Sequence, residues 1–291
     1  MHKLSRRRRG HHEGGNWVPL HEYERVAAEL RTDILADRYP VGTRLPAMTE
    51  LMTRFAVSQI TVRKAIGELQ KQGLVYTGYL DGLRGVIVRS RGRVPHYPTD
   101  SLRALRSDFT PSKRDSFTTS VIKAGREPGK KFTMKIAAPP ADIAALLGVD
   151  PGALVVQRTI YQLLDGEPWS RETSYFPTDL AAETGVDSSS DIAEGTMRRL
   201  RDRGVIEAAW TDVITDETAS PEDAVDLSIA VGSPLLVQTR IAATEDRITR
   251  VVRTVRLGGR SELLFEYGPD NALALIQQAH KRAHSRPQEN T

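Results

Sequence analysis

Residues 57–63 read Val-Ser-Gln-Ile-Thr-Val-Arg and lie between two amphipathic helical patterns. Ser58 is a favourable N-cap, because its hydroxyl can accept a hydrogen bond from a backbone N–H of the first helical turn, and Thr61 stands three positions later. We therefore expect a helix to begin here. Its apolar residues recur at spacings of three and four, which predicts one buried stripe. The stripe comprises Val62, Ala65, Ile66 and Leu69.

Two further helices are predicted upstream. One pattern covers residues 20–37 and ends before Pro40. A second, short helix follows Pro46, which pre-sets the backbone φ angle for a first helical turn. Its apolar positions are Leu51, Met52 and Phe55. Three helices in this order, the last with polar residues crowded into its first turns, are typical of a helix-turn-helix whose third helix enters the major groove of DNA.

A β-hairpin is expected directly after the third helix. Residues 74–76 and 86–88 are short β-type runs, and Asp81-Gly82 between them is a strong turn signal. Such a hairpin would form a wing beside the helices. Arg84 near its tip is positioned to reach a minor groove or a phosphate; the alternative is an exposed hairpin arginine with no role.

Charge and composition indicate different partners for the two parts of the chain. The 291 residues carry a net charge of +4, but residues 1–98 hold 17 Lys+Arg against 9 Asp+Glu, which leaves 24 against 28 for the remainder. A basic N-terminal part is typical of phosphate binding. The chain has no cysteine, which excludes disulfides and thiolate metal sites and fits a reducing cytosol. No apolar run approaches the length of a membrane span. We expect a cytoplasmic protein with no membrane partner and no cofactor.

We expect the following organisation: a disordered basic arm at 1–18, a winged helix at 19–92, a linker at 93–115, a second domain at 116–269, and a C-terminal helix and tail at 270–291. In the second domain, strand-like runs cover 117–123, 132–137, 154–164, 170–176, 206–215, 235–244, 248–257 and 261–267. Short helical patterns lie at 141–147, 191–203 and 221–227. Strands with interspersed helices and hairpin-like returns predict an antiparallel α+β domain.

These residues resemble a known family. The turn Pro40-Val41-Gly42-Thr43-Arg44-Leu45-Pro46, followed by Val57-Ser58-Gln59-Ile60-Thr61-Val62-Arg63-Lys64-Ala65, resembles the winged-helix DNA-binding domain of the GntR family of bacterial transcription regulators. The second part resembles the UTRA effector domain of the HutC subfamily, which has a chorismate-lyase-like fold. The matching stretches are residues 117–128, Asp165-Gly166-Glu167-Pro168, Thr173-Ser174-Tyr175-Phe176-Pro177 and Phe265-Glu266-Tyr267.

The resemblance implies two sets of site residues. Its DNA contacts fall on the third helix, the start of the second helix, the turn before it and the wing. They are Arg44, Thr49, Ser58, Gln59, Thr61, Arg63, Lys64, Gly82 and Arg84. Gln59 suits adenine, and Arg63 suits guanine or phosphate. The candidate effector-binding residues are Arg158 and Glu172, followed by Tyr175 and Arg240. For Arg158 and Glu172, a structural role within the sheet is the alternative.

The resemblance also implies a mechanism. One winged helix makes few contacts, so we expect a homodimer on a palindromic operator, held together by the C-terminal domains, that acts as a repressor and is released by a small-molecule effector. Two alternatives remain open at this point. The C-terminal domain only dimerises, or the protein is a chorismate-lyase-like enzyme. No catalytic set is evident from spacing, and no catalytic or metal-binding residue is expected.

Overall fold

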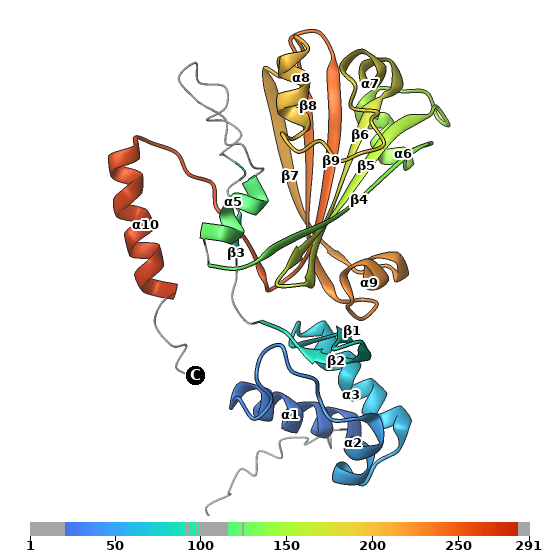
Figure 1. The fold of residues 1–291 in the computed structure, drawn as a ribbon, viewed down its shortest axis with the longest axis vertical. Helices are drawn as coiled ribbons and strands as arrows, with labels where there is room; N and C mark the ends of the chain where they lie inside the picture. The colour runs from blue at the N-terminus through green and yellow to red at the C-terminus, as the bar shows by residue number, and fades with distance from the viewer. Residues whose placement is uncertain (1–20, 91–93, 97, 99–115, 124, 285–291) are drawn as a thin grey trace, which may run out of the picture.

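The structure, a computed structural model, describes residues 21–90, 94–96, 98, 116–123 and 125–284 (Figure 1). The predicted arm at 1–18 lies outside the described residues. The N-terminal unit holds three helices followed by a hairpin (Figure 1). Its elements are α1 (Glu22–Leu35), α2 (Met48–Phe55), α3 (Gln59–Lys71), β1 (Val75–Leu80) and β2 (Leu83–Val88).

The third helix, α3, begins where the sequence predicts. The Ser58 hydroxyl accepts a hydrogen bond from the backbone N–H of Thr61 at 3.3 Å. All four residues of the predicted stripe are buried in one core with α1 and α2. The helix ends before Gly73, whose φ of +69° is the left-handed conformation that favours glycine. The predicted helix-turn-helix is therefore confirmed.

The wing is a tight hairpin with longer strands than the sequence patterns suggest. Strands β1 and β2 pair antiparallel from Val75↔Val88 to Leu80↔Leu83, which leaves two residues in the turn. These residues, Asp81 and Gly82, have φ angles of 50° and 74°. Two left-handed residues give a turn whose twist matches that of the flanking strands. The hairpin is therefore well defined up to its tip.

The C-terminal unit is built on a six-stranded antiparallel sheet of order β4-β5-β6-β9-β8-β7 (Figure 1). Its strands are β4 (Pro128–Ala137), β5 (Val155–Leu164), β6 (Glu167–Pro177), β7 (Ala209–Thr218), β8 (Pro234–Ala243) and β9 (Ile248–Leu257). Its helices are α5 (Ser116–Lys123), α6 (Ala141–Leu147), α7 (Thr178–Thr184), α8 (Thr196–Asp202), α9 (Pro221–Leu227) and α10 (Asp270–His284). The predicted α+β class is confirmed.

Helices cover both faces of this sheet. Helices α7 and α8 pack on one face around Val156 and Phe176. Helix α6 packs on the opposite face around Tyr175 and Val251, and α9 packs beside it around Val255. Successive side chains of a strand point to opposite faces. Neighbouring residues of β6 therefore belong to different cores.

Several sequence predictions for this unit are wrong. Residues 117–123 form helix α5 instead of a strand, because Phe117 and Val121, one helical turn apart, bury together against Leu164 and Trp169. The expected strand at 261–267 is reduced to β10 (Ser261–Leu263). Helix α8 is shorter than the pattern at 191–203, and α7 was not predicted.

The expected linker at 93–115 also contains structure. Residues Val94–His96 form strand β3, which pairs in parallel with β10. A strand of only three residues is too short to be recognised from the alternation of apolar and polar residues in the sequence. None of the helices in the described ranges is long and apolar enough to cross a membrane.

Candidate nucleic-acid interface and effector face

The first turns of α3 present polar side chains to solvent. Gln59, Arg63 and Lys64 are exposed, and Thr61 is half-buried beside the Ser58 hydroxyl at 2.9 Å. The Lys64 ammonium lies 5.7 Å from the centre of the Tyr23 ring. Among the described residues, Arg63 has no ion-pair partner. These groups are therefore available to an external partner, as predicted for a recognition helix.

Arg44 is held against the wing by its side chain. Its guanidinium donates a hydrogen bond to the carbonyl of Leu80 at 2.5 Å, near the wing tip. Its aliphatic part lies over Gly85, where an added Cβ would be 2.4 Å from the Arg44 Cδ. Only glycine leaves room for this arrangement. Arg44 therefore ties the wing to the helical core.

The wing tip and the second helix supply the remaining predicted positions. Arg84 is exposed and faces Tyr79 across the hairpin, while Gly82 forms the turn. Tyr79 is 75% exposed and Leu83 is 61% exposed, so both side chains lie at the surface of the wing tip. Thr49 is exposed in the first turn of α2. These side chains are accessible, but sequence reasoning did not single out Tyr79 or Leu83.

The folded N-terminal unit carries only a small net positive charge. Residues 21–90 hold 10 Lys+Arg and 8 Asp+Glu, so most of the basic excess seen in the sequence lies in residues 1–20 and 91–98. Half of these ten cations have an ion-pair partner in the described ranges, for example Arg54 with Asp33 at 2.5 Å. The cations without an ion-pair partner in the described ranges include Arg31, Arg63, Lys64 and Arg84. Three of these four lie on α3 or the wing.

The four predicted effector residues do not form one cluster. Arg158 is buried, and its guanidinium donates to the carbonyls of Val186, Ser188 and Ser190 at 2.8, 2.6 and 2.9 Å. It also stacks on the Phe132 ring at 4.4 Å. Its hydrogen-bonding groups hold the loop after α7, which agrees with the structural alternative for this residue.

Tyr175 lies on the opposite face of the sheet from Glu172. The two residues are three positions apart on β6, and successive side chains of a strand alternate between its faces, so they point to opposite sides of the sheet. Tyr175 packs with Ile143 and Leu147 of α6, and burial raises the pKa of its phenol. The structure therefore separates Tyr175 from the other candidates.

Glu172 and Arg240 share one polar region, which we call the effector face: the sheet face that carries Glu172, Gln238, Arg240 and Arg256. Arg256 is buried and donates to the Gln238 amide oxygen at 3.2 Å. Burial lowers the pKa of Arg256 to about 10, while the nearby Glu172 carboxylate opposes this shift. Among the described residues, Arg256 is therefore a buried cation without an ion-pair partner in this region.

Arg240 is held at the margin of the effector face. It pairs with Asp212 through two hydrogen bonds of 2.7 and 2.6 Å and donates to the carbonyl of Pro98 at 3.0 Å. His96 lies close by: burial, followed by the positive charges of Arg256 and Arg240, lowers its pKa to about 3. Sequence reasoning missed Arg256 and Gln238. Polar residues two positions apart, Gln238 and Arg240 on β8 and Thr254 and Arg256 on β9, were the signal that could have revealed them.

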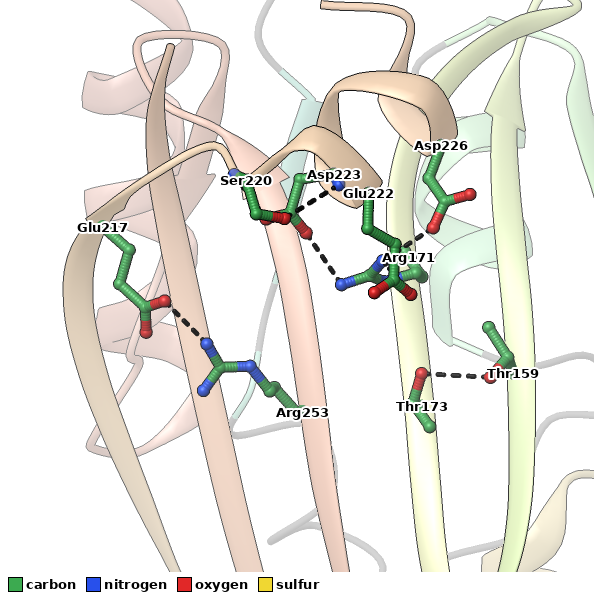
Figure 2. Close-up of polar contacts among 9 residues, drawn as sticks. All are labelled: Thr159, Arg171, Thr173, Glu217, Ser220, Glu222, Asp223, Asp226 and Arg253. Carbon is green, nitrogen blue, oxygen red and sulfur yellow. Dashed lines mark hydrogen bonds and ion pairs between the residues drawn. The ribbon is translucent and has the colours of Figure 1, made fainter. Parts of the chain in front are cut away.

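The other sheet face carries a polar network under α9 (Figure 2). Arg171 on β6 donates to Asp226 at 2.6 Å and to Asp223 at 2.7 Å, both on α9. Beside it, Arg253 donates to Glu217 at 2.6 Å. The Arg171 pairs attach α9 to the sheet, whereas the Arg253 pair links β9 to β7. A groove of about 230 Å³ next to α9 is lined by residues such as Tyr161 and Val225 and contains none of the predicted effector residues.

Fold and surfaces define a winged-helix DNA-binding protein joined to a separate effector domain. Comparison with known proteins agrees. The model of bacterial regulatory proteins of the gntR family matches residues 22–78, and the UTRA domain model matches residues 123–260. The chain belongs to the GntR family and is a DNA-binding transcriptional regulator with a UTRA effector domain.

Individual relatives include the HTH-type transcriptional regulator Rv0792c of Mycobacterium tuberculosis H37Rv, which is 30% identical over 224 residues, 76% of each chain. The HTH-type transcriptional repressor NagR of Bacillus subtilis 168 is 23% identical over 223 residues, 76% of this chain and 84% of NagR. A crystal structure of a GntR-family transcriptional regulator superimposes with a TM-score of 0.51 at 22% identity, covering 86% of this chain and 98% of that one.

Proposed function

We propose that the protein is a repressor that binds a palindromic operator as a homodimer and is released when a small molecule binds the C-terminal domain. It acts in the cytoplasm and turns over no substrate. The observation that carries this proposal is the set of accessible cations on α3 and the wing, next to a domain with an under-compensated buried cation. Similarity to NagR, which is named a repressor, supports the sign of regulation.

The proposed DNA contacts follow the exposed residues. Gln59 and Arg63 are the proposed base-reading residues, because an amide matches adenine and a guanidinium matches guanine. Backbone contacts are assigned to Thr49, Ser58, Thr61, Lys64, Gly82 and Arg84. Arg44 contributes indirectly, since its guanidinium is bonded to the wing carbonyl of Leu80. Such contacts to phosphates position the protein without reading the sequence.

The edge strand β7 is the proposed dimer surface. A strand edge presents unpaired N–H and C=O groups, and proteins protect such edges with lysines, prolines or a covering element. The opposite edge, β4, begins at Pro128, carries Lys130, Lys131 and Lys135, and contacts α5. Strand β7 has no lysine or proline, and none of its residues is buried.

A twofold pairing of β7 with its copy is compatible with its side chains. Antiparallel pairing centred on Val213 would set Asp212 opposite Ile214 and Trp210 opposite Asp216, so no two carboxylates would be directly opposed. Val213 and Ile214 are 45% and 38% exposed in the single chain. Pairing would cover them. The result would be one continuous antiparallel sheet across the dimer.

The proposed effector is a small polar molecule with an anionic group. Arg256 is the proposed partner of that group, because a buried guanidinium binds carboxylate or phosphate with little loss of hydration. Glu172, Gln238 and Arg240 would bind its polar groups. Arg158 and Tyr175 are proposed only as supports for this site. A purely dimerising domain would more simply have an apolar face in this region, so the buried cation favours an effector.

The experiment has two arms. Selection from a random duplex pool identifies the operator, and fluorescence anisotropy then measures its affinity while anionic and neutral metabolites are screened. We expect an inverted-repeat operator and at least one anionic metabolite that weakens binding in the wild type but not in Arg256→Gln. Binding to a non-repeated site would refute the dimer, and release only by neutral metabolites would refute the assignment of Arg256.

A further inference from the structure

The two domains meet through a buried charged group, which we call the Glu167 cluster: Arg89, Ser90, Glu167 and Arg260. Arg89 follows the wing strand β2, and Glu167 begins β6. The side chains of Arg89, Glu167 and Arg260 are only 1%, 6% and 8% exposed. Two buried guanidinium groups thus share one carboxylate between the DNA-binding unit and the effector domain.

Each guanidinium also bridges the domains through backbone groups. Arg89 donates to the carbonyls of Leu227 and Ser228, at the end of α9, at 3.0 Å each, and lies 3.4 Å from the Glu167 carboxylate. Arg260 donates to Glu167 and, across the junction, to the carbonyl and hydroxyl of Ser90 at 2.8 and 3.0 Å. Buried hydrogen bonds to charged groups are among the stronger polar contacts in proteins.

The segment that connects the recognition helix to the wing lies against this cluster. Gly73, immediately after α3, lies so close to the effector domain that an added Cβ would be 3.2 Å from the Arg260 Cδ and 3.2 Å from a Leu257 methyl. The Arg89 guanidinium stacks on the Tyr76 ring of the wing at 5.1 Å, and Arg260 stacks on Trp169 at 4.8 Å. The connection after α3 and the wing therefore both pack against the same few groups.

Electrostatics makes Glu167 indispensable to this junction. Removing one partner of a buried ion pair leaves an uncompensated charge and is strongly unfavourable. Here the loss of Glu167 would leave two buried cations and no anion. Burial already lowers the pKa of both Arg89 and Arg260, to about 10 for Arg89. The carboxylate is thus the group that allows the two guanidiniums to be buried together.

We propose that Glu167 is a positioning residue that fixes the orientation of α3 and the wing relative to the effector domain, and that β6 transmits changes at the effector face to DNA through it. Glu167 starts the same strand that presents Glu172 on the effector face. A displacement of this strand moves Glu167, Arg89 and Arg260 together. The second half of this proposal rests on the proposed function; the first half does not.

The test is an interdomain distance measurement on the full chain without DNA or effector. The absence of cysteine allows spin labels at Arg31→Cys on α1 and Ala145→Cys on α6, both exposed positions. Double electron–electron resonance should give one narrow distance for the parent. Glu167→Gln and Arg89→Gln should each broaden it at least twofold. Arg89→Gln leaves Arg260 paired with Glu167, so it remains informative if Glu167→Gln does not fold.

Glu207→Gln is the matched control, because Glu207 pairs with Arg250 in an equally buried site within the C-terminal domain. Its distance distribution should stay as narrow as that of the parent. Narrow, unshifted distributions in folded Arg89→Gln and Glu167→Gln would overturn the proposal, and so would equal broadening in Glu207→Gln. Neither result would bear on operator binding, which is measured separately.

Discussion

At the scale of single residues, Arg63 is the side chain with the clearest expected effect on DNA binding. It is exposed in the second turn of α3 and has no ion-pair partner among the described residues. Arg63→Ala should weaken operator binding by about 1–3 kcal/mol and relax base preference at one position per half-site. Anisotropy titrations with single-base operator variants measure both effects. Arg247→Ala, a surface cation paired with Glu183 in the C-terminal domain, is the control and should bind normally.

His96 should make stability depend on pH. Its folded pKa of about 3 lies below the unfolded value of about 6.5. Between these two pH values the unfolded chain therefore binds more protons than the folded protein. The free energy of unfolding thus decreases as the pH falls through this window. The loss should approach about 1.4 kcal/mol per pH unit. Urea unfolding between about pH 6 and pH 4 should show a steeper decline for the parent than for His96→Gln; parallel curves would contradict this assignment.

The buried pair of Glu207 and Arg250 should be important for the stability of the C-terminal domain. Burial by itself raises the pKa of Glu207. The Arg250 guanidinium at 2.8 Å and the Thr249 hydroxyl have a larger, opposite effect, so this pKa is lower than its ordinary value. Glu207→Gln should cost about 3–5 kcal/mol in unfolding free energy, because Arg250 loses its counter-charge. Thermal denaturation of the full chain measures this cost. A change below about 1 kcal/mol would show that the pair contributes no more than a surface ion pair.

Residue identities alone could not predict how an arginine is used. Arg158 and Arg256 lie in similar strand patterns, yet Arg158 donates to carbonyls 28 to 32 residues away. In the part of the chain that the structure describes, the Arg256 side chain donates instead to the amide oxygen of Gln238. That difference depends on where a distant loop runs. The capping of α3 by Ser58 and its buried stripe were predictable, because they depend only on neighbours within a few turns.

At the scale of elements, the wing should depend on Gly85. A Cβ at this position would contact the Arg44 side chain at 2.4 Å and displace it from the Leu80 carbonyl. Gly85→Ala should therefore weaken operator binding severalfold while the helical core remains folded. Gly67→Ala in α3 is the matched control, because its Cβ would meet open space. It should raise stability by about 0.5–1 kcal/mol, since glycine is unfavourable within a helix. Circular dichroism melts and anisotropy distinguish the two variants.

The sequence predicted the type of an element correctly where the local pattern was long. The prediction failed where packing against distant residues determined the type of the element. The strands β5, β8 and β9 lie close to their predicted ranges. By contrast, residues 117–123 are rich in β-branched side chains, but helix α5 lets Phe117 and Val121 bury together. Strand β3 exists only because β10 lies beside it. Neither partner is visible in the local sequence.

At the scale of the whole molecule, the sequence predicted two domains but not how they meet. The junction depends on Arg89, Glu167 and Arg260, which are up to 171 positions apart in the chain, and no local pattern shows that they meet. The charge distribution was predictable only in part. Most of the basic excess lies in residues 1–20 and 91–98, so removing residues 1–18 should reduce the salt dependence of DNA binding.

The dimer is expected to depend on the edge of the sheet. Val213→Lys places a charge in the middle of β7, where pairing with a second copy would bury it. Light scattering should show a monomer for this variant and a dimer for the parent at micromolar concentration. Lys131→Glu on the opposite edge, β4, is the control and should remain dimeric. A dimeric Val213→Lys protein would refute β7 as the interface.

The most direct test combines binding stoichiometry and affinity on one selected operator. Analytical ultracentrifugation of the full chain with a fluorescent inverted-repeat duplex should show two protomers per duplex, and Arg63→Ala should lower the affinity at least about fivefold at fixed salt. One protomer bound with full affinity, or an affinity that does not change in Arg63→Ala, would contradict a paired recognition helix α3 as the basis of DNA binding.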